Sequence, residues 1–131
     1  MFTHTRTRAL AAVGTAVAIG LPAALLVAAP AHADVDRRGT CGGGVYELSV
    51  DREAGGYEVS VDLDRVATTS RWTITMRQDG SRYFRGTRHA DHEGDVDVER
   101  LRPNTAGGDV FTFRAKKVGG TATCSAKIRM P

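Results

Sequence analysis

The sequence has few of the residues on which covalent and general-base catalysis depend. It contains four histidines, and only His89 and His92 lie beyond residue 33, within one short stretch. No Gly-x-Ser-x-Gly segment marks a nucleophilic serine, and no serine or cysteine can be matched to these histidines. A carboxylate pair for glycoside hydrolysis would need a groove, and the short chain has no cleft-forming insertion. We therefore expect a protein that is not an enzyme and that holds no cofactor.

Length and net charge are also small. The chain has 131 residues, with 18 basic and 15 acidic side chains and a formal net charge of +3. Without residues 1–33, which include Arg6 and Arg8, 98 residues with a net charge of +1 remain. This length allows one domain and excludes a multidomain enzyme, a TIM barrel and a doubly wound nucleotide-binding fold. A charge this close to zero gives no broad field for nucleic acid, so we expect no nucleic-acid partner.

The first 33 residues predict export. A stretch without charged side chains, residues 9–29, follows Arg6 and Arg8, and Ala31-His32-Ala33 places small residues where signal peptidase reads them. The alternative is an uncleaved anchor, since the stretch is about long enough to span a bilayer. Its glycines and proline, and the Ala-x-Ala ending, favour cleavage before Asp34. We expect a signal peptide over 1–33 and a single secreted domain over 34–131, without a stable membrane anchor.

The two cysteines, Cys41 and Cys124, lie close to the two ends of this domain. Exported proteins with an even, low number of cysteines usually pair them. The sequence therefore predicts a Cys41–Cys124 disulfide. A metal pair, a catalytic thiol and an intermolecular link are the alternatives, and no nearby residues support them.

Apolar and polar side chains alternate with a period of two, and no segment shows a helical stripe. The pattern predicts about seven short strands, each with one apolar face, joined by polar connectors rich in glycine. These strands are expected at 46–50, 57–63, 72–77, 83–86, 95–99, 111–115 and 123–128. The fold class is all-β, a two-layer antiparallel immunoglobulin-like sandwich. Its expected core comprises Leu48, Val59, Val61, Trp72, Ile74, Met76, Phe84, Val96, Val98, Phe111, Phe113 and Ile128.

Two hairpins are expected in the middle of the domain. A three-residue loop at 78–80 would place Ile74 opposite Phe84 and Trp72 opposite Gly86, which keeps the apolar side chains on one face. A second hairpin, between 83–86 and 95–99, would place Phe84 opposite Val98. The charged side chains Arg85 and Asp97 would then pair on the outer surface.

Acidic residues recur at alternate positions from 91 to 99. Carboxylates from a loop and a strand end could bind calcium, with Asp91, Glu93, Asp95 and Asp97 as ligands. The EF-hand spacing fails, because the loop lacks its glycine and its final acid. His89 and His92 have a spacing seen in zinc sites, but a structural zinc site needs four ligands. We expect a solvated strand face and a polar loop, with no metal.

Short runs of basic residues suggest an anionic partner, and strand geometry argues against it. Arg82, Arg85 and Arg88 belong to one expected strand, in which Arg85 would point away from the other two. The pairs at 37–38 and 116–117 lie near strand ends. We expect these side chains to be solvated, with Arg85 neutralised across the hairpin.

Several segments resemble small secreted actinobacterial proteins that have immunoglobulin-like sandwiches. They are the Cys-Gly-Gly-Gly of 41–44, the Arg-Trp-Thr-Ile of 71–74, the Phe-Arg-Gly-Thr of 84–87 and the Thr-Cys of 123–124. The resemblance implies export and fold and supplies no activity. Our hypothesis is a secreted, non-enzymatic binding or interaction module, with a protein or cell-wall partner. The alternatives are a small-molecule carrier resembling chromophore-binding sandwiches and a secreted enzyme inhibitor, whose contact loop would be 64–70 or 103–108.

Overall fold

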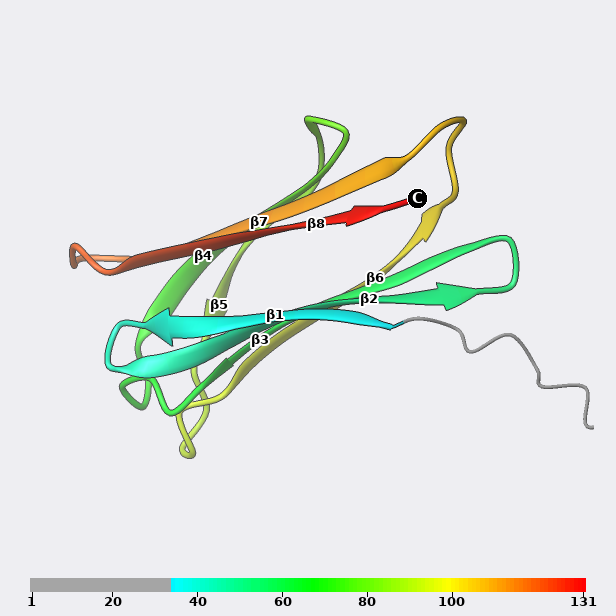
Figure 1. Cartoon of the computed structure of the whole chain (residues 1–131). Helices are drawn as coiled ribbons and strands as arrows, with labels where there is room; N and C mark the ends of the chain where they lie inside the picture. The colour runs from blue at the N-terminus through cyan, green and yellow to red at the C-terminus, as the bar shows by residue number, and fades with distance from the viewer. Residues whose placement is uncertain (1–33) are drawn as a thin grey trace, which may run out of the picture.

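The computed structural model describes residues 34–131, and the predicted signal peptide lies outside the described residues. This part of the chain consists of strands and connecting turns (Figure 1). Among the described residues no helix is long and apolar enough to cross a membrane. The strands are β1 (Val35–Cys41), β2 (Gly44–Glu53), β3 (Gly56–Asp64), β4 (Arg71–Gln78), β5 (Ser81–His89), β6 (Val96–Pro103), β7 (Asp109–Lys117) and β8 (Thr123–Met130).

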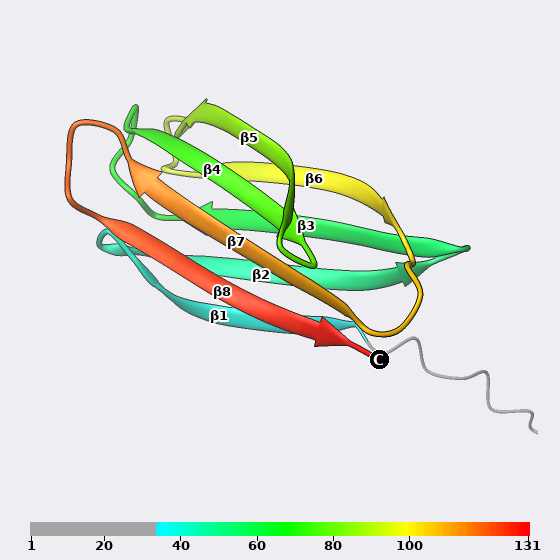
Figure 2. The ribbon, with the colours of Figure 1, turned by 90° about the horizontal axis from the view of Figure 1, so that it is seen from above.

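The strands form two four-stranded antiparallel sheets that pack face to face (Figure 1). The first sheet has the order β1-β2-β3-β6, and the second has the order β5-β4-β7-β8. Seen from above, β1 and β8 lie along one edge of the sandwich, and β5 and β6 lie along the other (Figure 2). The predicted two-layer antiparallel sandwich is confirmed. Its strand order differs from that of constant immunoglobulin domains, in which the first, second, fifth and fourth strands share a sheet.

Strand β1 is the one that the sequence pattern misses. Its sequence, Val-Asp-Arg-Arg-Gly-Thr-Cys, has no alternation of apolar and polar residues, and most of its side chains are exposed. An edge strand has only one neighbour to pair with, and charged residues on it prevent pairing with other chains. Gly39 lies opposite Tyr46, and a Cβ atom at Gly39 would come within 2.6 Å of the Tyr46 ring.

The core lies between the sheets and contains the predicted residues. Every member of the predicted core except Phe84 is buried. Aromatic rings from the two sheets meet edge to face, with 5.2 Å between the ring centroids of Tyr57 and Phe111. Phe84 is partly buried because β5 is an edge strand, and the Arg100 guanidinium covers its ring at 4.4 Å from the centroid.

The β4–β5 hairpin differs from the predicted register. Asp79 and Gly80 both have positive φ, 51° and 83°, as a two-residue type I′ turn requires. An irregularity in the ladder after Met76 then shifts the pairing by one residue. Ile74 therefore lies opposite Gly86, and the predicted pairs of Ile74 with Phe84 and of Trp72 with Gly86 are wrong. The β-bulge keeps Phe84 on the inner side despite the short turn.

The predicted hairpin between β5 and β6 is also wrong. Strand β6 pairs with β3 in the first sheet, and the loop after His89 carries the chain from one sheet to the other. Arg85 lies opposite Thr75, and Asp97 lies opposite Asp62. The predicted pairing of Arg85 with Asp97 therefore does not form, because the two residues are in different sheets.

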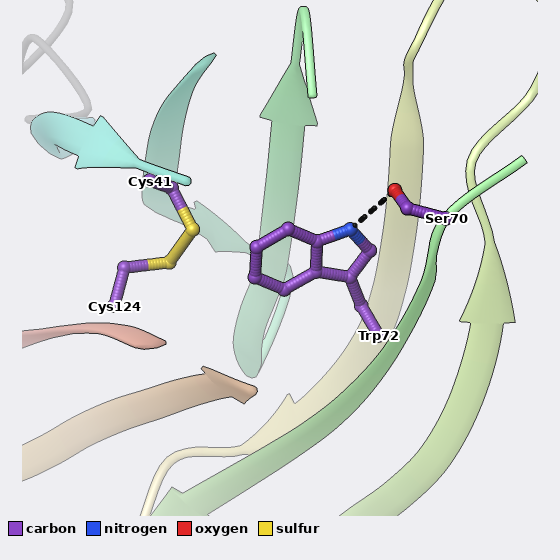
Figure 3. The surroundings of a disulfide bond; sticks show 4 residues. All are labelled: Cys41, Ser70, Trp72 and Cys124. Atoms are coloured by element: carbon purple, nitrogen blue, oxygen red, sulfur yellow. Dashed lines mark hydrogen bonds between the residues drawn. A yellow bond between two sulfur atoms is a disulfide. The ribbon is translucent and has the colours of Figure 1, made fainter. Parts of the chain in front are cut away.

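The predicted disulfide is present and joins the two sheets. Cys41 ends β1 and Cys124 lies at the start of β8, with 5.4 Å between their Cα atoms and a separation of 83 residues. The buried Trp72 indole lies between this disulfide and Ser70 (Figure 3). Its Nε1 donates a hydrogen bond to Ser70 Oγ at 2.9 Å, so the polar atom of the indole is satisfied.

A buried polar group connects the sheets at the other end of the sandwich. The carboxylate of Asp109, with no exposed surface, accepts hydrogen bonds from Gln78 Nε2 at 2.9 Å and from Thr105. Gln78 also accepts a hydrogen bond from Arg102 of β6, so the group extends from one sheet to the other. Burial raises the pKa of Asp109, and the hydrogen bonds from Thr105 and Gln78 outweigh it, so the pKa lies below its usual value.

Candidate functional site

The outer surfaces of the two sheets carry opposite charges. On the first sheet the outward side chains are mostly acidic, and we call this surface the acidic face. The other outward side chains include Arg38, Thr40, Val45, Ser49, Ser60 and the exposed Leu101. On the second sheet they are basic residues and hydroxyls, and we call this surface the basic face. The acidic face carries Asp36, Glu47, Asp51, Glu53, Glu58, Asp62, Asp64, Asp97 and Glu99. The basic face carries Arg77, Arg82, Arg85, Arg114, Lys116, Lys127 and Arg129, together with the hydroxyls of Thr73, Thr75, Thr87, Thr112, Thr123 and Ser125.

The register of the second sheet arranges the basic face in rows across the strands. In one row Arg82 and Arg77 lie opposite each other, and Thr112 and Lys127 continue the row. Like charges directly opposite each other are destabilising, so this pair lowers the stability of the sheet unless an anion lies between the two side chains.

The next row brings cations to both sides of a hydroxyl. Arg85 and Arg114 lie on either side of Thr75, and Ser125 follows. Neighbouring strands are about 4.8 Å apart, so the Cα atoms of these two arginines, which are two strands apart, are separated by about 10 Å.

No acid interrupts the basic face. Asp109 is the only acidic residue in β4, β5, β7 and β8, and it is fully buried in the hydrogen-bonded group that links the sheets. Asp79, in the turn after β4, lies at the end of this face, where its carboxylate accepts hydrogen bonds from the Val110 amide and the Thr105 hydroxyl. Over the strands themselves the exposed charges are positive, although the net charge of the domain is near zero. Such a surface attracts anions over a distance of about one Debye length, about 8 Å at physiological ionic strength.

A shallow, open depression lies on the basic face. Its volume is about 900 Å³, and the turn at 118–121 between β7 and β8 contributes to its wall. Six basic residues line it: Arg77, Arg82, Arg85, Arg114, Lys116 and Lys117. The remaining lining is mainly threonine and glycine, with hydroxyls and open backbone rather than a closed apolar cavity.

The structure corrects the prediction for the basic residues. The bulge in the β4–β5 ladder brings Arg82 and Arg85 to the same face, where strict alternation had separated them. Arg88 lies on the inner side of the edge strand β5, and its guanidinium is 5.2 Å from the Phe84 ring centroid. No acid neutralises Arg85. Of the two remaining pairs, Lys116 and Lys117 both line the depression, whereas Arg38 forms an ion pair with Glu47.

The acidic face has few basic side chains to balance the charge of its carboxylates. Glu47, Asp62 and Asp97 lie side by side across β2, β3 and β6. Partial burial and the neighbouring carboxylates of Asp64 and Asp97 raise the pKa of Asp62 to about 6. The carboxylate of Glu99 likewise raises the pKa of Glu58. Arg38 is the one basic side chain on this face within the described strands.

Removing the charge of Asp62 should stabilise the domain. The folded-state pKa lies above the unfolded one, so stability falls as pH rises from about 4 through 6, and the full penalty is present at pH 7. Solvent screens this half-exposed group, so we expect Asp62→Asn to raise the free energy of unfolding by about 1 kcal/mol at pH 7. Urea unfolding between pH 4 and 8 measures it, with the exposed Asp36→Asn as a control that should change less. A less stable Asp62→Asn at pH 7 would contradict the expectation.

The acids that we considered as possible calcium ligands are only partly brought together. The carboxylates of Asp91, Glu93 and Asp95 lie within 4.8 Å of one another, whereas Asp97 points from β6 toward Asp62. Asp91 Oδ1 accepts hydrogen bonds from the amides of Glu93 at 2.8 Å and Asp95 at 2.9 Å. These hydrogen bonds lower the pKa of Asp91 and hold the loop in its turn conformation. Asp91 therefore has a structural role in the loop.

The two histidines whose spacing resembles that of zinc ligands lie at the end of β5 and in the loop that follows it. Among residues 34–131, neither His89 nor His92 belongs to a group of three possible metal ligands.

The interior of the sandwich is filled. The largest fully buried side chains, Trp72, Tyr57 and Phe111, occupy the space between the sheets. Two depressions lie on the outside of the described part of the chain, one on the basic face and one near the turn at 53–56. The larger of these two is the one on the basic face.

Comparison of the chain with protein-family models, with curated proteins and with solved structures gave no match. The candidate site therefore stands on its geometry and charge. The resemblance to small secreted actinobacterial proteins stays a prediction.

Proposed function

We propose that this chain is a secreted, non-enzymatic binding module whose ligand is an extended anionic polymer bound on the basic face. The observation that carries the proposal is the uninterrupted basic face of β5-β4-β7-β8, with no exposed acid in its four strands. In the extracellular space such polymers include wall and matrix polysaccharides that bear phosphate or sulfate. The proposal gives a chemical class to the cell-wall partner that the sequence suggests.

The chemistry of the basic face suits phosphate and sulfate. Arginine guanidinium groups offer planar pairs of N–H donors that match the oxygens of these anions. Arg85 and Arg114 flank the hydroxyl of Thr75, which can donate to an oxygen between them. Across the strands most cations are separated by one hydroxyl residue, so they lie about 10 Å apart, and along a strand residues of the same face lie about 7 Å apart. This spacing suits a polymer that carries several charges along its length.

The basic face is less suited to nucleic acid. Proteins that bind single-stranded nucleic acid stack the bases on exposed aromatic rings, worth about 1–3 kcal/mol per base. The outward side chains of the basic face in the described strands include no aromatic residue. Phe113 lines the depression but is only 2% exposed. We therefore favour a polymer without bases, in agreement with the predicted absence of a nucleic-acid partner.

A binding role also agrees with what the basic face lacks for catalysis. Its groups donate hydrogen bonds and carry positive charge, and no carboxylate among them can act as a general base. In the described part of the chain, no hydroxyl is hydrogen-bonded to a histidine. The site sits on paired strands of a sheet, which fixes the backbone positions of the cations before the ligand binds.

Binding to defined polymers tests the proposal. Fluorescence titration of the domain 34–131 with sodium polyphosphate and with dextran sulfate should show saturable binding, and neutral dextran should show none. Oligothymidylate of equal charge should bind no more tightly than polyphosphate, because the face has no stacking platform. Equal response to neutral dextran and polyphosphate would overturn the proposal. A preference for oligothymidylate would assign the face to nucleic acid instead.

Export is tested separately. Expression of the full chain in a secreting bacterial host should release into the medium a protein whose first residue is Asp34, as the Ala-x-Ala ending predicts. Edman sequencing of the medium protein gives this residue. A protein that stays with the cells and begins at Met1 would contradict the prediction of a cleaved signal peptide.

A further inference from the structure

The acidic face is a second flat surface of one charge, on the opposite side of the sandwich from the basic face. Its outward rows run across β1, β2, β3 and β6 as the basic rows run across β5, β4, β7 and β8. One row contains Arg38, Glu47, Asp62 and Asp97, and the next contains Asp36, Ser49, Ser60 and Glu99. The ion pair between Arg38 and Glu47 is the only salt bridge among the described residues.

The two faces are complementary in sign and in spacing. Both are outer surfaces of four-stranded antiparallel sheets, so the rows on each repeat at the same strand separation of about 4.8 Å. On the acidic face, neighbouring carboxylates raise the pKa values of Asp62 and Glu58, so nearby cations would stabilise their charged forms. On the basic face, no cation of the described strands forms a salt bridge.

The two faces cannot meet within one molecule, because the filled core separates them. We propose that the acidic face of one copy of this chain binds the basic face of a second copy. The contact uses different surfaces on the two partners, so it is heterologous, and repeating it produces an open stack. This inference goes beyond the proposed function. It uses the same basic face, so an anionic polymer and a second copy compete for it.

The interaction is electrostatic and should depend strongly on salt. The Debye length falls from about 30 Å at 0.01 M to about 3 Å at 1 M ionic strength. Sedimentation velocity of the domain 34–131 should show dimers and larger species at low salt, which grow with protein concentration. At high salt the same sample should be monomeric, with an apparent dissociation constant at least about tenfold weaker.

Two matched variants identify the faces. The acid-face variant carries Glu58→Gln, Asp62→Asn and Glu99→Gln, and the base-face variant carries Arg77→Gln, Arg85→Gln and Arg114→Gln. Each keeps one face intact and removes three charges from the centre of the other without reversing its sign. Alone, each variant should be monomeric at low salt. Mixed in equal amounts, they should form a 1:1 complex of twice the monomer mass, because the intact basic face of one binds the intact acidic face of the other.

Several results would overturn this inference. Wild-type protein that stays monomeric at low salt, or an equal mixture of the variants that does not associate, would exclude the contact. Self-association of the acid-face variant as strong as that of the wild type would place the interface elsewhere. Binding of poly-lysine to monomeric wild type would assign the acidic face to a different basic partner.

The same variants separate this inference from the proposed function. The acid-face variant should still bind polyphosphate, because its basic face is unchanged. Polyphosphate binding without self-association would remove only the stacking contact. Self-association without polyphosphate binding would remove only the polymer ligand.

Discussion

Loss of the Cys41–Cys124 disulfide should lower the free energy of unfolding by about 4–5 kcal/mol. The two cysteines are 83 residues apart, and a bridge across so long a segment removes much of the conformational freedom of the unfolded chain. In a domain of this size the total is about 5–15 kcal/mol. At about 4–8 °C per kcal/mol, the melting temperature should fall by roughly 15–40 °C. Urea and thermal unfolding of Cys41→Ala/Cys124→Ala against the wild type measures both quantities.

Reductant provides the matched control. The reduced wild type should unfold at nearly the same urea concentration as the double variant, and reductant should leave the double variant unchanged. In the folded state the bridge holds the β1 and β8 edge together beside Trp72 (Figure 3). A loss of less than about 1 kcal/mol would show that the unfolded chain is not constrained by the bridge as the loop-entropy argument assumes.

Salt should weaken the binding of an anionic polymer to the basic face by about two orders of magnitude. Each cation that neutralises a charge on a single-stranded polyanion contributes about −0.7 to the slope of log K against log salt. If about six of the cations on the basic face take part, the slope is about −4, and a rise from about 50 mM to about 200 mM salt weakens binding roughly 200-fold. Titration with polyphosphate at a series of salt concentrations measures the slope.

The variant Arg85→Gln/Arg114→Gln sharpens this prediction. Removal of two contacts should make the slope shallower by about one. A slope near zero in the wild type would mean that the polymer is held by contacts other than charge. An unchanged slope in the variant would mean that these two arginines do not touch the polymer.

The strands and the core were predictable from local alternation, because each of the predicted strands buries one face. Strand β1 was not, since its middle residues are charged and it shows no alternation of apolar and polar side chains. The hairpin at Asp79-Gly80 was misplaced because a short turn and a bulge together give the same inner face as a longer loop. Alternation alone cannot tell these two solutions apart.

The charged faces could not be predicted strand by strand. Arg85 and Asp97 belong to consecutive strands, and consecutive strands usually pair. A hairpin in which Asp97 neutralises the charge of Arg85 was therefore the natural expectation. The structure sends β6 to β3 instead, and the charges then separate by sheet. One signal was present in the sequence. The segments 71–78, 81–89, 109–117 and 123–130 contain many basic residues and a single acid, Asp109.

The proposed function requires that the basic face, rather than the basic residues in general, binds an anionic polymer. Two variants with the same net charge test it. The first is Arg85→Gln/Arg114→Gln on the basic face, and the second is Arg37→Gln/Arg65→Gln, which removes two exposed arginines outside it. None of these four side chains belongs to the core, so both variants should fold like the wild type.

The measurement is the dissociation constant for polyphosphate at about 50 mM salt. A cation near an anionic surface contributes about 1 kcal/mol, so the basic-face variant should bind about 30-fold more weakly than the wild type. The control variant should stay within about twofold of the wild type, because its lost charges are distant from the polymer. Equal weakening of both variants would show that only net charge matters. Unchanged binding in both would contradict the assignment of the basic face as the binding surface.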